Sequence, residues 1–142
     1  MKIKPNKFTD SLNIIKSRTS LDDYIRFSFQ YVDQSNDKFK FCDCETVYFI
    51  KVIERLKNLC AWKMKDFISC RSDALKANYI EWSLSSEPNG FSHILNTELW
   101  AENSREFSIS RNEYGRIEGF IIDNTFYIVW FDRSHKLFPA ER

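Results

Sequence analysis

Glycine and proline are scarce in this chain of 142 residues, with three of each. Because tight turns depend on these two residues, their scarcity disfavours a turn-dense all-β sandwich. Apolar runs are also short, and none approaches the length of a membrane span. The opening MKIKPNKFTD has basic residues but lacks the apolar core of a secretory signal. These absences predict a cytoplasmic protein whose four cysteines are reduced thiols.

Aromatic residues are abundant, at 16% of the chain with thirteen Phe, and hydrophobic residues make up 43%. This composition predicts one globular domain over residues 1–142, with residues 1–20 as an N-terminal arm or a short helix. Net charge is only +1, but basic residues predominate in residues 1–20 and 46–71. A polyanion would therefore meet local basic patches rather than a generally basic surface.

Two segments in the first half have clear periodicities. YIRFSFQYV alternates apolar and polar residues, which predicts a half-buried antiparallel strand over residues 24–32. The following segment predicts the longest helix, from a cap at Asp43 to about Ala61, with Phe49, Ile53, Leu56 and Cys60 on its buried side. Between residues 71 and 103 the signals are mixed, with SSEPNG as a loop and SHILNTELW as a short helix.

The last third predicts a three-stranded meander over residues 105–111, 116–122 and 125–132. A two-residue turn at Asp123-Asn124 pairs Ile122 with Thr125, and it pairs Glu118 with Val129. A three-residue loop ending at Gly115 places Phe107 and Ile109 on the apolar face. That face also holds the following residues: Ile117, Gly119, Ile121, Phe126, Ile128 and Trp130. The opposite, mixed face carries Arg116 and Glu118, and His135 can fold back toward it. We expect an ordinary solvent-facing sheet or an active site there.

Arg116, Glu118 and His135 together have the chemistry for cleaving RNA without a metal. The attacking 2′-hydroxyl must lose a proton and the leaving 5′-oxygen must gain one. Glu118 is then the candidate base, His135 the acid and Arg116 the clamp on the phosphate. The candidate RNA-binding residues are Lys51, Arg55, Arg111, Tyr127, Arg133 and Lys136. On the predicted helix, Lys51 and Arg55 either form a solvated face or guide phosphates.

Other chemistries have little support. The cysteines form one C-x-C pair and two distant single residues, which favours small buried thiols over a zinc site. A cysteine nucleophile with His93 or His135 has no distinguishing pattern. There is no Gly-rich phosphate loop, no H-E-x-x-H and no G-x-S-x-G. We therefore expect neither a cofactor nor a metal.

The order REFSISR…GRIEGFIIDNTFYIVWFDRSHKLF resembles the C-terminal half of RelE/HigB-like toxins, over about the last 38 residues. Those proteins have a helical part, then an antiparallel meander with an arginine on a middle strand, and a terminal His or Arg followed by an aromatic. Arg116 matches the strand arginine, and His135-Lys136 with Phe138 matches the terminal motif, although Phe138 lacks the hydroxyl of the tyrosine often found there. The resemblance implies a small RNA endonuclease, often ribosome-dependent, restrained by an antitoxin protein.

These observations predict an α+β fold in which a twisted antiparallel sheet of about four strands packs on one long helix. The functional prediction is a metal-independent RNA endonuclease, acting as a toxin or phage-defence effector. The alternative is a non-catalytic module that binds a protein or RNA through the mixed face of the sheet.

Overall fold

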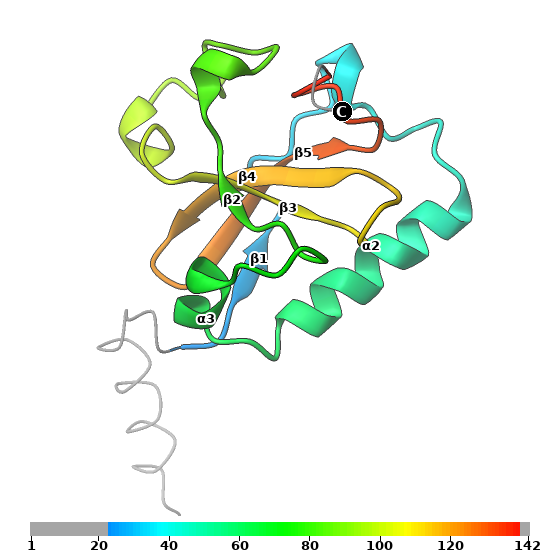
Figure 1. Cartoon of the computed structure of the whole chain (residues 1–142). Helices are drawn as coiled ribbons and strands as arrows, with labels where there is room; N and C mark the ends of the chain where they lie inside the picture. The colour runs from blue at the N-terminus through cyan, green and yellow to red at the C-terminus, as the bar shows by residue number, and fades with distance from the viewer. Residues whose placement is uncertain (1–22, 140–142) are drawn as a thin grey trace, which may run out of the picture.

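The fold is α+β, as predicted, and the computed structural model describes residues 23–139 (Figure 1). The predicted N-terminal arm, residues 1–20, lies outside the described residues. The long helix is α2 (Thr46–Leu59), and a shorter helix, α3 (Met64–Ser69), follows it. Short 3₁₀ helices lie at Asp37–Phe39, Trp82–Leu84 and Thr97–Leu99. Within residues 23–139, no helix has the length and apolar character needed to cross a membrane.

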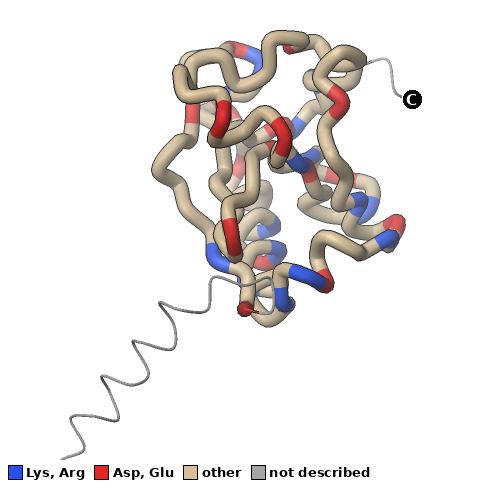
Figure 2. The backbone as a smooth tube through the Cα atoms, turned by 90° about the vertical axis from the view of Figure 1, so that its left-hand side faces the viewer, with Lys and Arg blue, Asp and Glu red and all other residues tan. Residues whose placement is uncertain are grey.

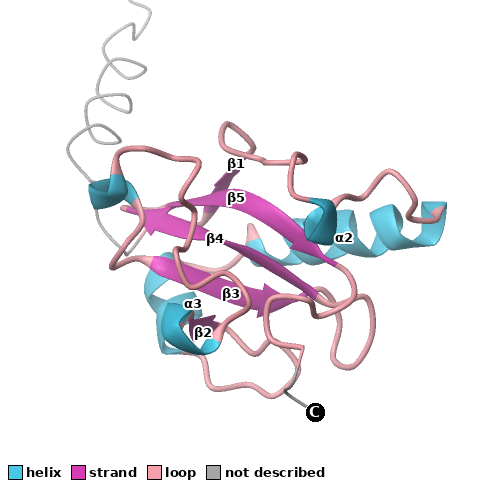
Figure 3. Cartoon of the chain, turned by 90° about the horizontal axis from the view of Figure 1, so that it is seen from above, coloured by secondary structure: helices cyan, strands magenta, loops and turns pink. Residues whose placement is uncertain are grey.

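The sheet has five strands in the order β1-β5-β4-β3-β2, which Figure 3 shows from above. The strands are β1 (Arg26–Ser28), β2 (Asn78–Tyr79), β3 (Ser104–Ser108), β4 (Arg116–Ile122) and β5 (Thr125–Asp132). The bounds predicted for β4 and β5 are confirmed. The strand predicted at residues 24–32 is shorter, and it runs parallel to β5 rather than antiparallel. The sheet is therefore mixed, because β1 pairs with a strand about a hundred residues away and no hairpin constrains its direction.

One face of the sheet packs on α2 and α3. The helix residues in this core are Tyr48, Val52, Leu56, Leu59, Met64 and Phe67. The helix was predicted to bury Phe49, Ile53, Leu56 and Cys60. Leu56 is buried as predicted, but the prediction was wrong for the other three, and Ile53 is 60% exposed. Helix α2 is apolar over a wide arc, so its periodicity allows two stripes one residue apart, and contact with the sheet selects one of them.

The second face of the sheet is also buried, which contradicts the prediction of a solvent-facing mixed face. Phe39, Phe91, Trp100 and Trp130 belong to a separate aromatic core on this side. Loops and short helical turns from residues 31–39 and 80–103 pass over the near face in Figure 3. The Trp130 ring stacks on Phe39 with centroids 4.3 Å apart. Residues 80–103 of the mixed segment therefore serve as a cover for the sheet.

A β-bulge separates the two ends of the β4–β5 hairpin. Ile122 pairs with Thr125 as predicted, but Glu118 pairs with Trp130, and Gly119 pairs with Ile128. Val129 is the extra residue, so the predicted Glu118–Val129 pair was wrong. The bulge reverses the faces of the residues that follow it, which puts Trp130 in the second core and Phe131 in the helix-side core.

Strands β3 and β4 keep the predicted alternation of side chains between the two faces, but they pair in a different register. Phe107 pairs with Ile117 and Ser108 with Arg116, so the loop is longer than three residues. Phe107 and Ile109 lie in the helix-side core, as predicted. Gly115 has φ +73°, which confirms its left-handed conformation.

We expect Gly119→Ala to lower the free energy of unfolding by about 3 kcal/mol, through overpacking at the bulge. An added Cβ would lie 2.0 Å from the Tyr127 carbonyl oxygen and 2.7 Å from the Phe126 ring. Urea denaturation measures the loss. Thr125→Ala, at the half-buried start of β5, is the control and should cost less than about 1 kcal/mol. Equal stability of the two variants would show that the backbone at the bulge yields easily.

Candidate functional site

Four charged residues lie together on the second face of the sheet and form a carboxylate cluster: Glu106, Arg116, Glu118 and Asp132. Arg116 pairs with Asp132 across β4 and β5, and Glu106 pairs with Glu118 across β3 and β4. Direct partners in an antiparallel pair share a face, so the four side chains leave the sheet on one side. Glu106, Glu118 and Asp132 are all buried.

Three of the four charges have strong partners. The Arg116 guanidinium donates to the Glu106 carboxylate at 2.8 Å, and both side chains are largely buried. The Asp132 carboxylate accepts backbone N–H groups of Lys136 at 2.7 Å and Leu137 at 2.9 Å. A buried charge is tolerated only when it is paired or hydrogen-bonded in this way.

Glu118 differs from its neighbours because it is fully buried. Burial raises the pKa of its carboxyl well above the usual range, and the nearby charge of Asp132 raises it further. Glu106 acts in the same direction, while Arg116 opposes the shift. Neither carboxyl oxygen of Glu118 has a hydrogen-bond partner among the described residues. The raised pKa favours the neutral acid over the carboxylate, which is unfavourable for the predicted role of Glu118 as a base.

A cavity of about 600 Å³ opens beside this cluster, and we call it the acid cavity. It is lined by Asn78, Tyr79, Glu81, Leu84, Ser85, Ser86, Glu106, Phe138 and Pro139. Of the cluster, Glu106 alone is among these lining residues. Glu106 is therefore the member of the cluster that lies at the wall of the cavity, with its side chain 6% exposed.

The C-terminal segment closes one side of the acid cavity. Ser86 donates its hydroxyl to the Lys136 carbonyl at 2.6 Å and its backbone N–H to the Leu137 carbonyl at 2.8 Å. His135 comes just before these contacts, is exposed, and has φ +57°. The structure thus brings Arg116 and Glu118 into one buried cluster, and it places His135 in a surface turn next to the segment that lines the cavity.

A second hollow of about 430 Å³ adjoins the acid cavity, and we call it the basic hollow. It is lined by Ile68, Ser69, Arg71, Ala77, Asn78, Tyr79 and Arg105. The Tyr79 side chain belongs to both hollows, is 65% exposed, and lies 4.1 Å from the Arg105 guanidinium carbon. Tyr79 is thus an accessible aromatic ring between a carboxylate and a guanidinium.

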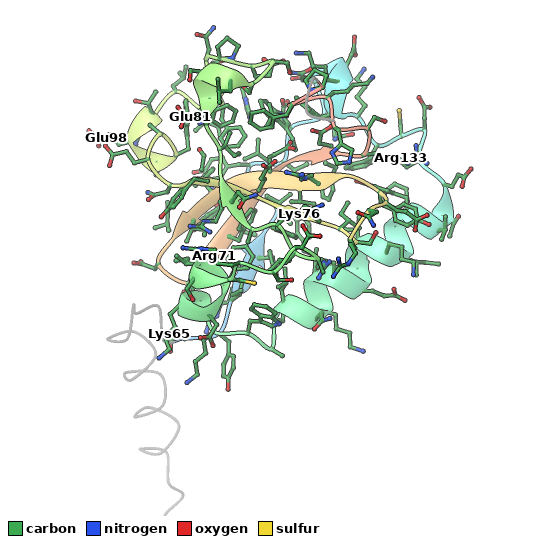
Figure 4. All side chains as sticks on the ribbon, in the orientation of Figure 1. Lys65, Arg71, Lys76, Glu81, Glu98 and Arg133 are labelled. Carbon is green, nitrogen blue, oxygen red and sulfur yellow. The ribbon has the colours of Figure 1, made fainter. Side chains whose placement is uncertain are left out.

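The charges near β2 are segregated. Figure 4 shows Lys65, Arg71 and Lys76 below Glu81 and Glu98. Elsewhere, acidic and basic positions are interspersed along the tube, as Figure 2 shows. The lower end of the β2 edge is therefore the part of this surface that favours an anion.

The predicted RNA-binding residues of α2 have other partners. The Arg55 guanidinium donates to the carbonyls of Ile109 at 3.0 Å and Ala74 at 3.2 Å. Burial lowers the pKa of Arg55. Its side chain connects α2 to the segments that contain Ile109 and Ala74. Lys51 is 3.7 Å from Glu54 on the same helix. A solvated helix surface accounts for Lys51.

The remaining predicted RNA-binding cations are at the surface. Arg111 forms an exposed ion pair with Asp73 at 3.2 Å. Arg133 is exposed, with its guanidinium carbon 6.0 Å from the Tyr48 ring centre. Lys136 is exposed in the C-terminal segment, adjacent to the acid cavity. Of these three, Lys136 is nearest in the chain to residues that line the cavity.

Tyr127 is half-buried and therefore a poor stacking surface for bases. Its ring stacks on Phe120 at 5.2 Å between centroids, and Tyr31 lies 5.7 Å away. The cysteines were predicted to be buried, and this was wrong: Cys42 and Cys60 are exposed, and the other two are intermediate. Residues 23–139 contain no group of three or more His, Cys, Asp or Glu side chains arranged to hold a metal ion.

Sequence reasoning missed Glu106, Asp132 and Tyr79. The alternation of β3 was a usable signal for Glu106, since it precedes the buried Phe107 and therefore faces the same way as Ser108. Asp132 could be found only by predicting the bulge, because the bulge reverses the side of the sheet on which Asp132 lies. Tyr79 lies on a two-residue strand that has no periodicity of its own.

Comparison of the chain with protein-family models, with curated proteins and with solved structures gave no match. The resemblance to RelE/HigB-like toxins is thus neither supported nor opposed by these comparisons. Any functional argument rests on the geometry at the β2 edge.

We expect Glu118→Gln to make the protein less sensitive to rising pH. Because the folded-state pKa of Glu118 is raised, the folded state holds more protons than the unfolded state above about pH 4.3, and stability falls as pH rises. The neutral amide removes this loss. The variant should therefore match or exceed the wild type at neutral and alkaline pH, and its advantage should shrink toward pH 4.

Urea unfolding at several pH values measures this difference. Glu98→Gln, at an exposed carboxylate, is the matched control and should follow the wild type throughout. A Glu118→Gln variant that is destabilised equally at every pH would show that Glu118 is held as a carboxylate.

Proposed function

We propose that the chain is a metal-independent RNA endonuclease that binds single-stranded RNA across Tyr79 and cleaves it in the acid cavity. The observation that supports this is the placement of one carboxylate, Glu106, at the wall of a cavity that shares Tyr79 with a basic hollow. RNA cleavage needs a base, an acid, and cations near the phosphate. The β2 edge and the turn at His135 supply these groups, with roles that differ from those suggested by the sequence.

In the proposed reaction, the Glu106 carboxylate takes the proton of the 2′-hydroxyl as the 2′-oxygen attacks phosphorus. The bond from phosphorus to the 5′-oxygen breaks, and His135, when protonated, gives its proton to that oxygen. The products are a 2′,3′-cyclic phosphate and a 5′-hydroxyl. Arg116 donates to the Glu106 carboxylate at 2.8 Å and is a positioning residue. Glu118 is fully buried and its pKa is raised, so we assign it no proton transfer.

Substrate binding uses the other side of Tyr79. An exposed ring provides a stacking surface for any base, which suits an enzyme that acts on single strands. Arg71 lines the basic hollow, where its charge meets the phosphate backbone. Because the cations are few, we expect weak binding of RNA by the chain alone.

The biological role that we propose is a cytoplasmic toxin or phage-defence effector, restrained by an antitoxin protein. Its support is the resemblance of the β3–β5 segment and the His135-Lys136 motif to RelE/HigB-like toxins. Ribosome-bound messenger RNA is then a substrate that compensates for weak binding of free RNA.

An RNA-binding module without catalysis is the second candidate. The observation that favours it is the burial of the cluster, in which Glu118 is inaccessible and the Glu106 side chain is 6% exposed. Such a module would bind RNA at Tyr79 and the basic hollow and leave it intact.

We expect Glu106→Gln to reduce cleavage of a single-stranded RNA in EDTA by roughly 10²–10⁴-fold, because the amide cannot accept the proton. His135→Ala should have a comparable effect, whereas Glu118→Gln should keep nearly full activity because Gln matches a neutral Glu. Single-turnover cleavage assays measure these rates, and circular dichroism verifies the fold. Full activity of Glu106→Gln, or loss of activity in Glu118→Gln, would contradict the assignment of the base.

Growth after induction in a bacterial host provides a second readout for the same variants. The wild type should arrest growth, and Glu106→Gln should not, at equal soluble levels. Intact RNA and normal growth with the wild type, together with binding of the RNA, would favour the module.

We expect Tyr79→Ala to weaken binding of single-stranded RNA by about tenfold, within the range for loss of one stacked base. Arg71→Gln should reduce the slope of log affinity against log salt by about 1, because one phosphate contact is lost. Fluorescence anisotropy at several salt concentrations measures both effects. Lys57→Gln, at an exposed position on α2, is the control and should leave affinity and slope unchanged. Equal effects of Arg71→Gln and Lys57→Gln would remove the basic hollow from the binding site.

A further inference from the structure

Helix α2 leaves an apolar groove uncovered on the side of the molecule formed by β1 and α2. The groove has a volume of about 320 Å³, and its lining contains no polar surface. It is lined by Phe29, Val32, Phe41, Phe49, Val52, Ile53, Leu56 and Phe131. Phe29 and Ile53 are more than half exposed, at 56% and 60%.

The exposed apolar surface extends beyond the groove along α2. Val47 and Ile50 are 40% and 49% exposed. The exposed side of a surface helix usually carries charged residues instead. Large apolar patches of this kind on a folded protein indicate a surface that is covered by another segment or molecule. Within residues 23–139, this apolar surface is left exposed.

We propose that the chain's own N-terminal segment, residues 1–22, occupies this groove through Phe8, Leu12 and Ile15. The spacing of these residues, four and then three, is that of one side of a helix. This apolar pattern matches the apolar lining of the groove.

The covalent connection makes this occupant favourable. Six residue steps separate Asp23 from Phe29, which lines the groove, and they span at most about 20 Å. The eight steps from Ile15 to Asp23 span up to about 27 Å, so Ile15 can reach the groove. A segment on a short flexible tether has a millimolar effective concentration at a nearby site. An untethered partner at a lower concentration must bind the groove more tightly to compete with it. This proposal is independent of the proposed nuclease activity.

Photocrosslinking of the full chain tests the proposal. Benzoylphenylalanine in place of Ile53 should give intrachain cross-links to peptides that contain residues 8–15, identified by mass spectrometry. The same group in place of Leu95, which is 91% exposed and does not line the groove, should give none of these cross-links. The substitutions Leu12→Asp and Ile15→Asp, which lie outside the cores of residues 23–139, should abolish the cross-links formed from position 53.

Two outcomes would overturn the proposal. Cross-links that join two copies of the chain would make the groove an interface between copies. A cross-linking yield at position 53 no higher than at position 95 would show that residues 8–15 do not occupy the groove. If the fold is disturbed by benzoylphenylalanine at position 53, Phe49, which also lines the groove, is the second position for the same measurement.

Discussion

The β-bulge at Val129 determines how the rest of the structure is assembled. It shifts the β4–β5 register between Glu118 and Gly119, so that Trp130 enters the second core and Phe131 enters the helix-side core. The same shift turns Asp132 toward Arg116. A regular hairpin would place Trp130 against the helices and Asp132 on the opposite face from Glu118. The place of Trp130 in the second core and the place of Asp132 in the carboxylate cluster both depend on this single extra residue.

The cluster shows three different ways of holding an acidic group inside a protein. Glu106 has a guanidinium partner, Asp132 has two backbone N–H donors, and the raised pKa of Glu118 favours its neutral acid form. Each avoids a bare buried charge, which would cost several kcal/mol. The arrangement also ties the C-terminal segment to β5, because the two donors to Asp132 come from Lys136 and Leu137. The end of the chain is thereby positioned against the acid cavity.

A feature of the fold could be predicted from the sequence where its cause lay within a short segment of the chain. The bounds of β4 and β5 followed from alternation and the Asp123-Asn124 turn, both of which are local. The parallel pairing of β1 and the cover formed by residues 80–103 depend on contacts between distant segments, for which a single sequence has no signal. Helix α2 presented two apolar stripes, and its sequence alone did not choose between them. Gly119 was the one local indication of a bulge, since glycine within a strand often marks one.

The prediction of the candidate site was limited in the same way, because contacts between distant segments decide which of its residues are exposed. Arg116 and Glu118 were correctly placed on one face, yet their exposure was inferred from a sheet with one open face. Once both faces are covered, burial raises the pKa of an internal carboxyl, and access is left to the edge of the sheet. Glu106 is one strand closer to that edge than Glu118, and it is the member of the cluster that lines a cavity. A carboxyl in the centre of a doubly covered sheet is out of reach of a ligand, whereas the same group next to an edge strand lies close to one.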